Sequence, residues 1–218
     1  GTGVMTEDKE LGRVLEIHDA LRGVTQLWVR SEDWGEEEAQ RLREEAVLLN
    51  HKRYFRSVAA YRSLAEDAGM DEDVTDVEVI KADLMFATDI FKSYDPALID
   101  NAEWQQMTEW LRTVFGGELP GDYSNVKSLE EWLQRLMDAE LNIMTSSGTS
   151  GQYSFVPRDM NTRMGLMMNS ALVFQPFFGK VLETISDYDA AILNFSSGSA
   201  GVQAASNSIG NIVRTAHY

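Results

Sequence analysis

The stretch Leu141–Pro157, with the sequence LNIMTSSGTSGQYSFVP, decides how the second part of the chain folds. Apolar residues precede and follow the hydroxyl and glycine residues of Thr145–Gly151, a pattern that predicts a strand, a loop and a second strand. Glycine permits positive φ, while Ser and Thr add donors without bulk. Such a loop can direct several N–H and O–H groups to one point, as polyphosphate binding requires. A solvated Ser/Gly turn is the alternative interpretation.

Charge divides the sequence near residue 140. The net charge is −16; residues 1–140 contain 31 acidic and 15 basic residues, whereas residues 141–218 contain four of each. The first region is expected to be mainly helical with a solvated acidic surface. The second is expected to be an incomplete α/β unit whose low charge indicates that other material covers it, either another domain or a second copy. The predicted fold class is therefore α/β, with a helical N-terminal region (1–140) followed by the α/β unit (141–218).

Composition excludes several classes of function. A chain with a net charge of −16 repels the phosphates of nucleic acids. No apolar window of about 18 residues is present, so no membrane span is expected. The absence of cysteine excludes disulfides, thiolate metal sites and a cysteine nucleophile within this chain, and it favours a cytoplasmic setting. No spacing of His, Asp and Glu residues predicts a metal site.

Apolar periodicity predicts a series of helices in the first region. They are expected at Glu7–Gly23, Glu36–Ala68 and Asn101–Phe115, and after the capping box Ser128-Leu129-Glu130-Glu131. The segment Val77–Phe91 is compatible with a strand, a short helix or a turn.

Four smaller features complete the expected organisation. Gly69 is placed to end the second helix, and Asp159 is placed to cap a helix after the predicted strands. Ala190–Phe195 is a candidate buried strand. The basic run His51–Arg56 predicts a solvated helix face, including the histidine.

Motif spacing distinguishes three kinds of phosphate loop. The Walker A and dinucleotide-binding spacings are both absent from the sequence. Thr145–Gly151 closely resembles the Thr-Ser-Gly-Thr-Thr-Gly loop of adenylate-forming acyl and aryl ligases. Tyr54–Gly69 resembles the Phe-Tyr-Arg … Ala-Gly helix of phenylacetate-CoA-ligase-like enzymes. Asp83–Lys92 resembles the Pro … Phe-Lys segment of lux-type acyl-protein synthetases, and Gly148–Asp159 is similar to the same group.

The resemblance implies an ATP-dependent ligase with ATP and Mg²⁺ as cofactors. In that family a carboxylic acid, fatty or aryl, attacks the α-phosphate to form an acyl-adenylate, and a thiol of a protein or of CoA then takes the acyl group. Carried over by position, the phosphate-binding residues would be Ser146, Ser147, Gly148, Thr149, Ser150, Gly151 and Ser154. Arg158 is a further candidate anion contact, and a helix cap with a local ion pair at Arg158-Asp159 is the alternative. No catalytic residue is identified.

The sequence also departs from the family pattern. Many superfamily loops end in Gly-x-Pro-Lys, whereas Gln152-Tyr153-Ser154 follows here. The magnesium-binding glutamate, the ribose-binding aspartate, the catalytic lysine of the small C-terminal domain and the acyl-accepting cysteine have no counterpart. We therefore expect the N-terminal portion of such a ligase, inactive alone. The alternative is a non-catalytic α/β module whose Ser/Gly loop binds a phosphorylated ligand or only connects strands.

Overall fold

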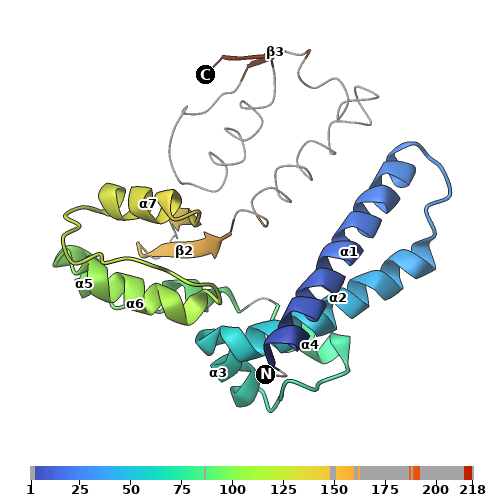
Figure 1. Cartoon of the computed structure of the whole chain (residues 1–218), viewed down its shortest axis with the longest axis horizontal. Helices are drawn as coiled ribbons and strands as arrows, with labels where there is room; N and C mark the ends of the chain where they lie inside the picture. The colour runs from blue at the N-terminus through green and yellow to red at the C-terminus, as the bar shows by residue number, and fades with distance from the viewer. Residues whose placement is uncertain are drawn as a thin grey trace. The chain divides into compact units, whose positions relative to one another are not determined.

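Helices make up most of the described structure, and the sheets are small (Figure 1). The computed structural model describes residues 3–85, 87–147, 151–159, 162, 187, 189–191 and 214–217. The helices are α1 (Gly3–Val29), α2 (Glu36–Ser57), α3 (Ala59–Asp67), α4 (Val77–Asp83), the 3-10 helix η1 (Thr88–Lys92), α5 (Ala97–Asp100), α6 (Trp104–Val114) and α7 (Leu129–Asp138). The strands are β1 (Asn142–Ser147), β2 (Tyr153–Arg158), β3 (Asp189–Ala191) and β4 (Thr215–His217). The described residues thus form a mixed, mostly helical fold.

Among the described residues, two pairs of strands are present, and each pair forms its own sheet. β1 and β2 are antiparallel, whereas β3 and β4 are parallel. β3 overlaps the strand predicted at Ala190–Phe195, of which residues 192–195 lie outside the described residues. The chain divides into two compact units, residues 1–90 with 112–117 and residues 91–111 with 118–218. No helix in the described part of the chain combines the length and apolar character needed to span a membrane.

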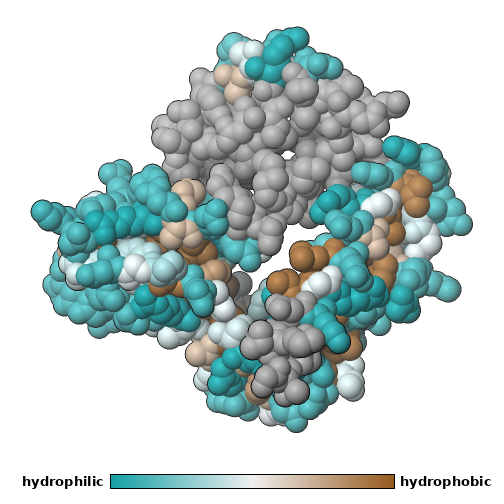
Figure 2. Space-filling model, in the orientation of Figure 1, coloured by the Kyte–Doolittle hydropathy of each residue, from teal (hydrophilic) through white to brown (hydrophobic). Residues whose placement is uncertain are grey.

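In the first unit, α1 and α2 form a helical hairpin (Figure 1). Their contact is apolar, with Ile17 fully buried against Leu42 and Ala46. An ion pair joins the same two helices, since Arg13 Nε lies 2.6 Å from Glu45 Oε1. α1 is longer at both ends than the predicted helix Glu7–Gly23. Hydrophilic residues cover much of the described surface (Figure 2), in keeping with the charge of this region.

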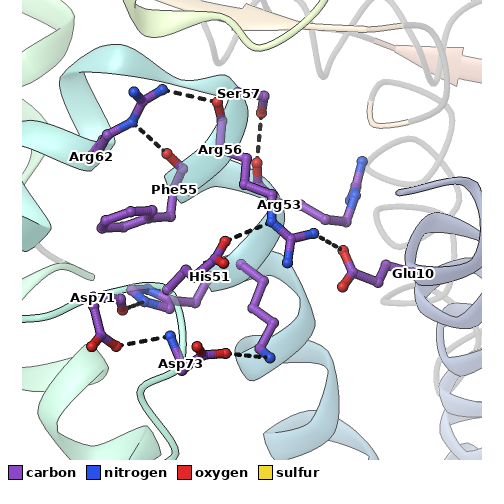
Figure 3. Close-up of polar contacts among 11 residues, drawn as sticks. Glu10, His51, Arg53, Phe55, Arg56, Ser57, Arg62, Asp71 and Asp73 are labelled. Atoms are coloured by element: carbon purple, nitrogen blue, oxygen red, sulfur yellow. Dashed lines mark hydrogen bonds and ion pairs between the residues drawn. The ribbon is translucent and has the colours of Figure 1, made fainter. Parts of the chain in front are cut away.

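The long helix predicted at Glu36–Ala68 is wrong, because the chain breaks at Val58 into α2 and α3. The break lies where Gly116 approaches: a Cβ on Gly116 would meet Ser57 Oγ at 2.5 Å and Val58 Cγ2 at 3.1 Å. Arg62 satisfies the carbonyls exposed by the break, donating to Phe55 O at 2.8 Å and to Arg56 O at 2.9 Å (Figure 3). Tertiary packing therefore overrides the helical pattern.

His51 is buried, so the prediction of a solvated histidine is also wrong. Its side chain is 1 % exposed. Nε2 donates to Asp71 O at 2.7 Å (Figure 3), because a carbonyl oxygen can only accept. In the neutral ring Nδ1 then accepts from Tyr61 Oη at 2.8 Å. Both ring nitrogens are satisfied inside the core, which stabilises the loop after α3 against α2.

Ion pairs surround this buried histidine. Arg56 pairs with Glu72 at 2.6 Å and with Glu10 of α1 at 2.9 Å, and Lys52 pairs with Asp73 at 3.0 Å (Figure 3). The basic residues of the run thus hold the acidic loop and α1 to α2. The predicted end of the helix at Gly69 is confirmed, with φ of 75° and a hydrogen bond from its N–H to Glu66 O at 2.9 Å.

The second unit contains a core of aromatic residues supported by α6 and α7. Trp104 and Trp132 are buried with ring centroids 5.9 Å apart. Trp132 Nε1 donates to Thr108 Oγ1 at 2.9 Å, and that hydroxyl donates to Trp104 O at 2.8 Å. The predicted N-cap is confirmed, since Ser128 Oγ accepts from the N–H of Glu131 at 3.1 Å, while the Glu131 carboxylate accepts from the N–H of Lys127 at 3.0 Å rather than from that of Ser128. These two helices form the support on which the β1–β2 hairpin packs.

Tyr61 gives the first unit a measurable pH dependence. Burial raises the pKa of Tyr61 to about 12, from an ordinary value near 10. The folded state therefore favours the neutral phenol, and this contribution to stability is complete below pH 10 and lost as the pH rises from about 10 to 12. We expect the free energy of unfolding, measured in urea at pH values from about 10 to 12, to fall less steeply with pH in Tyr61→Phe than in the wild type. Tyr153→Phe, at an exposed tyrosine, serves as the control, and an unchanged slope in Tyr61→Phe would contradict the assignment.

Candidate functional site

The stretch Leu141–Pro157 forms a β-hairpin. β1 and β2 are antiparallel with Ser146 opposite Ser154 and Ser147 opposite Tyr153. The predicted order of strand, loop and strand is thus confirmed for the described residues, but the loop is shorter than the predicted Thr145–Gly151, because residues 145–147 pair with β2 and belong to β1. Three of the expected phosphate-binding residues, Gly148, Thr149 and Ser150, lie outside the described residues.

One face of the hairpin packs into the aromatic core. Phe155 is 0 % exposed, and its ring centroid lies 5.3 Å from that of Tyr94, 5.6 Å from that of Trp132 and 6.4 Å from that of Trp110. Because side chains alternate along a strand, Ser154 is directed to the opposite face. The burial of Phe155 therefore determines which face carries the expected phosphate-binding serines.

On that opposite face, Ser146 and Ser154 form a directly opposed pair, and their hydroxyls hydrogen-bond to each other. Ser146 is exposed and Ser154 is buried. The structure therefore brings these two predicted residues together. Ser146 is therefore the member of the pair that solvent can reach, and Ser154 holds its hydroxyl by a hydrogen bond.

Arg158 lies at the other end of the hairpin. It is opposite Asn142, whereas the loop follows Ser147, so it is about 16 Å along the strand from Tyr153. Its Nε donates to Met144 Sδ at 2.7 Å. The alternative interpretation of a helix cap has support from the neighbouring residue, because Asp159 Oδ1 accepts from the N–H of Thr162 at 2.7 Å. The structure thus does not bring Arg158 to the serine pair.

The loop rejoins β2 through Gly151 and Gln152. Gly151 has a φ of 77°, a conformation that favours glycine, and a Cβ added there would meet no atom within 4 Å. Gln152 Nε2 donates to Lys92 O at 2.8 Å and to Tyr94 O at 3.3 Å. Tyr94 Oη donates in return to Tyr153 O at 2.7 Å. We call this reciprocal set of hydrogen bonds between residues 92–94 and 152–153 the loop clamp.

Sequence reasoning did not identify the loop clamp. Tyr94 is buried, and burial raises its pKa, so the phenol remains a hydrogen-bond donor over the physiological range. Its partner Tyr153 is distant in the sequence, so no local pattern predicts the contact. The one feature of the sequence that relates to the clamp is the glutamine that follows Gly151. The clamp fixes the end of the loop in one conformation.

The electrostatics of the hairpin suit an anion. The sequence from Leu141 to Arg158 contains no acidic residue, in a chain whose net charge is −16. Backbone N–H groups near a glycine of positive φ can bind an anionic oxygen, and the hairpin itself contributes no carboxylate that would repel it. In the part of the chain that the structure describes, no three His, Cys, Asp or Glu side chains are grouped so as to hold a metal ion.

A groove of about 320 Å³ lies elsewhere, between α1, α2 and α4 of the first unit. Its lining is mostly apolar, including Leu21, Val47 and Val77, and Arg43, Glu44 and Lys81 also border it. It contains none of the residues expected to bind phosphate.

Comparison with protein-family models, curated proteins and solved structures gives no match for this chain.

Removing the Tyr94 hydroxyl tests the loop clamp. Tyr94→Phe keeps the ring contacts but loses the bond to Tyr153 O, so stability in urea unfolding should fall by about 1 kcal/mol. Tyr54→Phe removes a hydroxyl from an exposed side chain and should change stability little. Equal effects of the two substitutions would show that the clamp bond contributes nothing.

Proposed function

We propose that this chain is the phosphate-binding portion of an ATP-dependent ligase that activates a carboxylic acid as an acyl-adenylate and passes the acyl group to a thiol. The observation that carries the proposal is the β1–β2 hairpin, whose Ser/Thr/Gly loop returns through a glycine of positive φ beside an exposed serine hydroxyl. The motif resemblance of Thr145–Gly151 and its flanks supports the same function. The thiol acceptor would be CoA or a cysteine of a protein, since this chain contains no cysteine.

The described residues fit a polyphosphate in three respects. Gly151 presents backbone without a side chain that would block a phosphate. Ser146 offers an exposed hydroxyl, positioned by Ser154. The loop clamp holds the end of the loop in place before the ligand binds, and such preorganised donors stabilise charge that develops on phosphate oxygens.

The wider setting follows from the same proposal. ATP supplies the phosphorus atom that the carboxylate oxygen attacks, with pyrophosphate as the leaving group, and Mg²⁺ would arrive on the phosphates. The acid would be a fatty or aryl acid. The low-charge residues 141–218 would contact the rest of the ligase or a second copy. We place this activity in the cytoplasm, consistent with the absence of cysteine.

One observation favours a second function, that of a non-catalytic binding or interaction module. The hydroxyls of Ser146 and Ser154 are hydrogen-bonded to each other, and the side chain of Gln152 is bound to residues 92–94. These contacts would also serve a loop that binds another phosphorylated ligand or only connects two strands. Nucleotide binding distinguishes the two functions.

Two substitutions of Gly151 that differ only in charge test the proposal. Asp and Asn are nearly isosteric, both tolerate positive φ better than most residues, and a Cβ at this position would meet no atom within 4 Å. In calorimetric titration with Mg-ATP, Gly151→Asp should abolish binding, because a carboxylate there repels the phosphates. Gly151→Asn should retain most of the affinity of the wild type. No binding of Mg-ATP to the wild type, or equal affinities of the two variants, would contradict a phosphate site at this loop.

A further inference from the structure

Lys92 is held next to the end of the hairpin loop. It is the last residue of η1, and its carbonyl oxygen accepts the hydrogen bond from Gln152 Nε2 at 2.8 Å. Gln152 directly follows Gly151, the glycine of positive φ. A lysine side chain spans about 6 Å from Cα to Nζ. The loop clamp therefore holds the backbone of Lys92 beside Gln152, and an extended lysine side chain of this length can reach toward the Gly151–Ser154 end of the loop.

The ammonium of Lys92 has no counterion in the described part of the chain, although the residue is partly buried. Among the other described lysines, Lys52 lies 3.0 Å from Asp73 and Lys81 lies 2.8 Å from Glu78. Lys9 and Lys127 are in no ion pair among the described residues either, but both are exposed, unlike Lys92. A partly buried cation gains from an anionic partner. Lys92 can therefore pair with an anion that is not part of the described residues.

The carboxylates nearest to Lys92 in sequence are directed elsewhere or exposed. Asp95 Oδ1 accepts from the N–H of Ala97 at 3.0 Å, which engages it at the start of α5. Asp89, one turn earlier in η1, is exposed and is not paired with Lys92 among the described residues. The hairpin contributes no acidic residue, and its only cation, Arg158, lies at the far end of β2. A polyphosphate bound at the loop would therefore meet no cationic side chain of the hairpin, and another segment would have to supply it.

We propose that Lys92 is a ligand-binding residue that supplies this cation to a polyphosphate bound at the Gly151–Ser154 end of the loop. This inference rests on the proposed function. The clamp delivers the lysine from a different segment, because the side chain of Gln152 holds the backbone of residues 92–94 rather than contacting the ligand. An ammonium at this point forms a charge-assisted hydrogen bond to a phosphate oxygen and offsets the acidic charge of the chain.

Calorimetric titration of the full chain with Mg-ATP tests the inference with three variants. Lys92→Gln removes the charge at similar length and should weaken binding about tenfold or more. Lys92→Arg keeps the charge and should retain most of the affinity for Mg-ATP. If the side chain had only a structural role, the affinity would not depend on its charge in this way. Lys127→Gln makes the same change in net charge at an exposed residue and should leave the affinity within about twofold.

The outcomes separate the inference from the proposed function. If the wild type binds Mg-ATP and Gly151→Asp does not, but Lys92→Gln binds like the wild type, the phosphate site stands and the role of Lys92 is overturned. Equal weakening by Lys92→Gln and Lys127→Gln would also overturn it, because the effect would then be one of net charge. No binding to the wild type would overturn both proposals. Loss in Lys92→Gln with recovery in Lys92→Arg supports the inference.

Discussion

The burial of Phe155 in the aromatic core is the contact on which the hairpin depends. Its ring packs against Tyr94, Trp110 and Trp132, which come from three separate segments of the second unit. Because side chains alternate along β2, a shift of one residue would bring Ser154 into this core and expose the phenylalanine. The cost of exposing a large aromatic side chain therefore fixes the register of the hairpin, and with it the face on which Ser146 and Ser154 meet.

The loop clamp adds a second, polar constraint to this apolar one. Tyr94 contributes to both, since its ring packs on Phe155 while its hydroxyl donates to Tyr153 O. The same tyrosine thus links the position of β2 to the conformation of the loop end. Gly151 can hold its positive φ at little cost, and Gln152 joins the loop to Lys92. In the proposed phosphate site, these contacts at residues 151–153 would lower the cost of ordering the loop end when an anion binds.

Local signals in the sequence predicted local structure well. The N-cap at Ser128, the glycine at the end of α3 and the two strands around the Ser/Gly run follow from chemistry within a few residues of each position. The break at Val58 could not be predicted in this way, because it depends on the close approach of Gly116. His51 was misassigned for a similar reason: its partners are a tyrosine and a carbonyl supplied by other segments. In the candidate site, the serines were identified from the Ser/Gly run, and Lys92 only as the end of the Asp83–Lys92 resemblance. The contacts of residues 92–94 with the end of the hairpin loop depend on the fold.

Amide hydrogen exchange of the full chain, measured with and without Mg-ATP, tests the central claim that the hairpin loop and the segment held by the clamp form one polyphosphate site. We expect slower exchange on addition of Mg-ATP in peptides that cover residues 92–94 and 146–154, and unchanged exchange in the α1–α2 hairpin. Unchanged exchange in both of the first two regions, or slower exchange in the α1–α2 hairpin alone, would contradict the account.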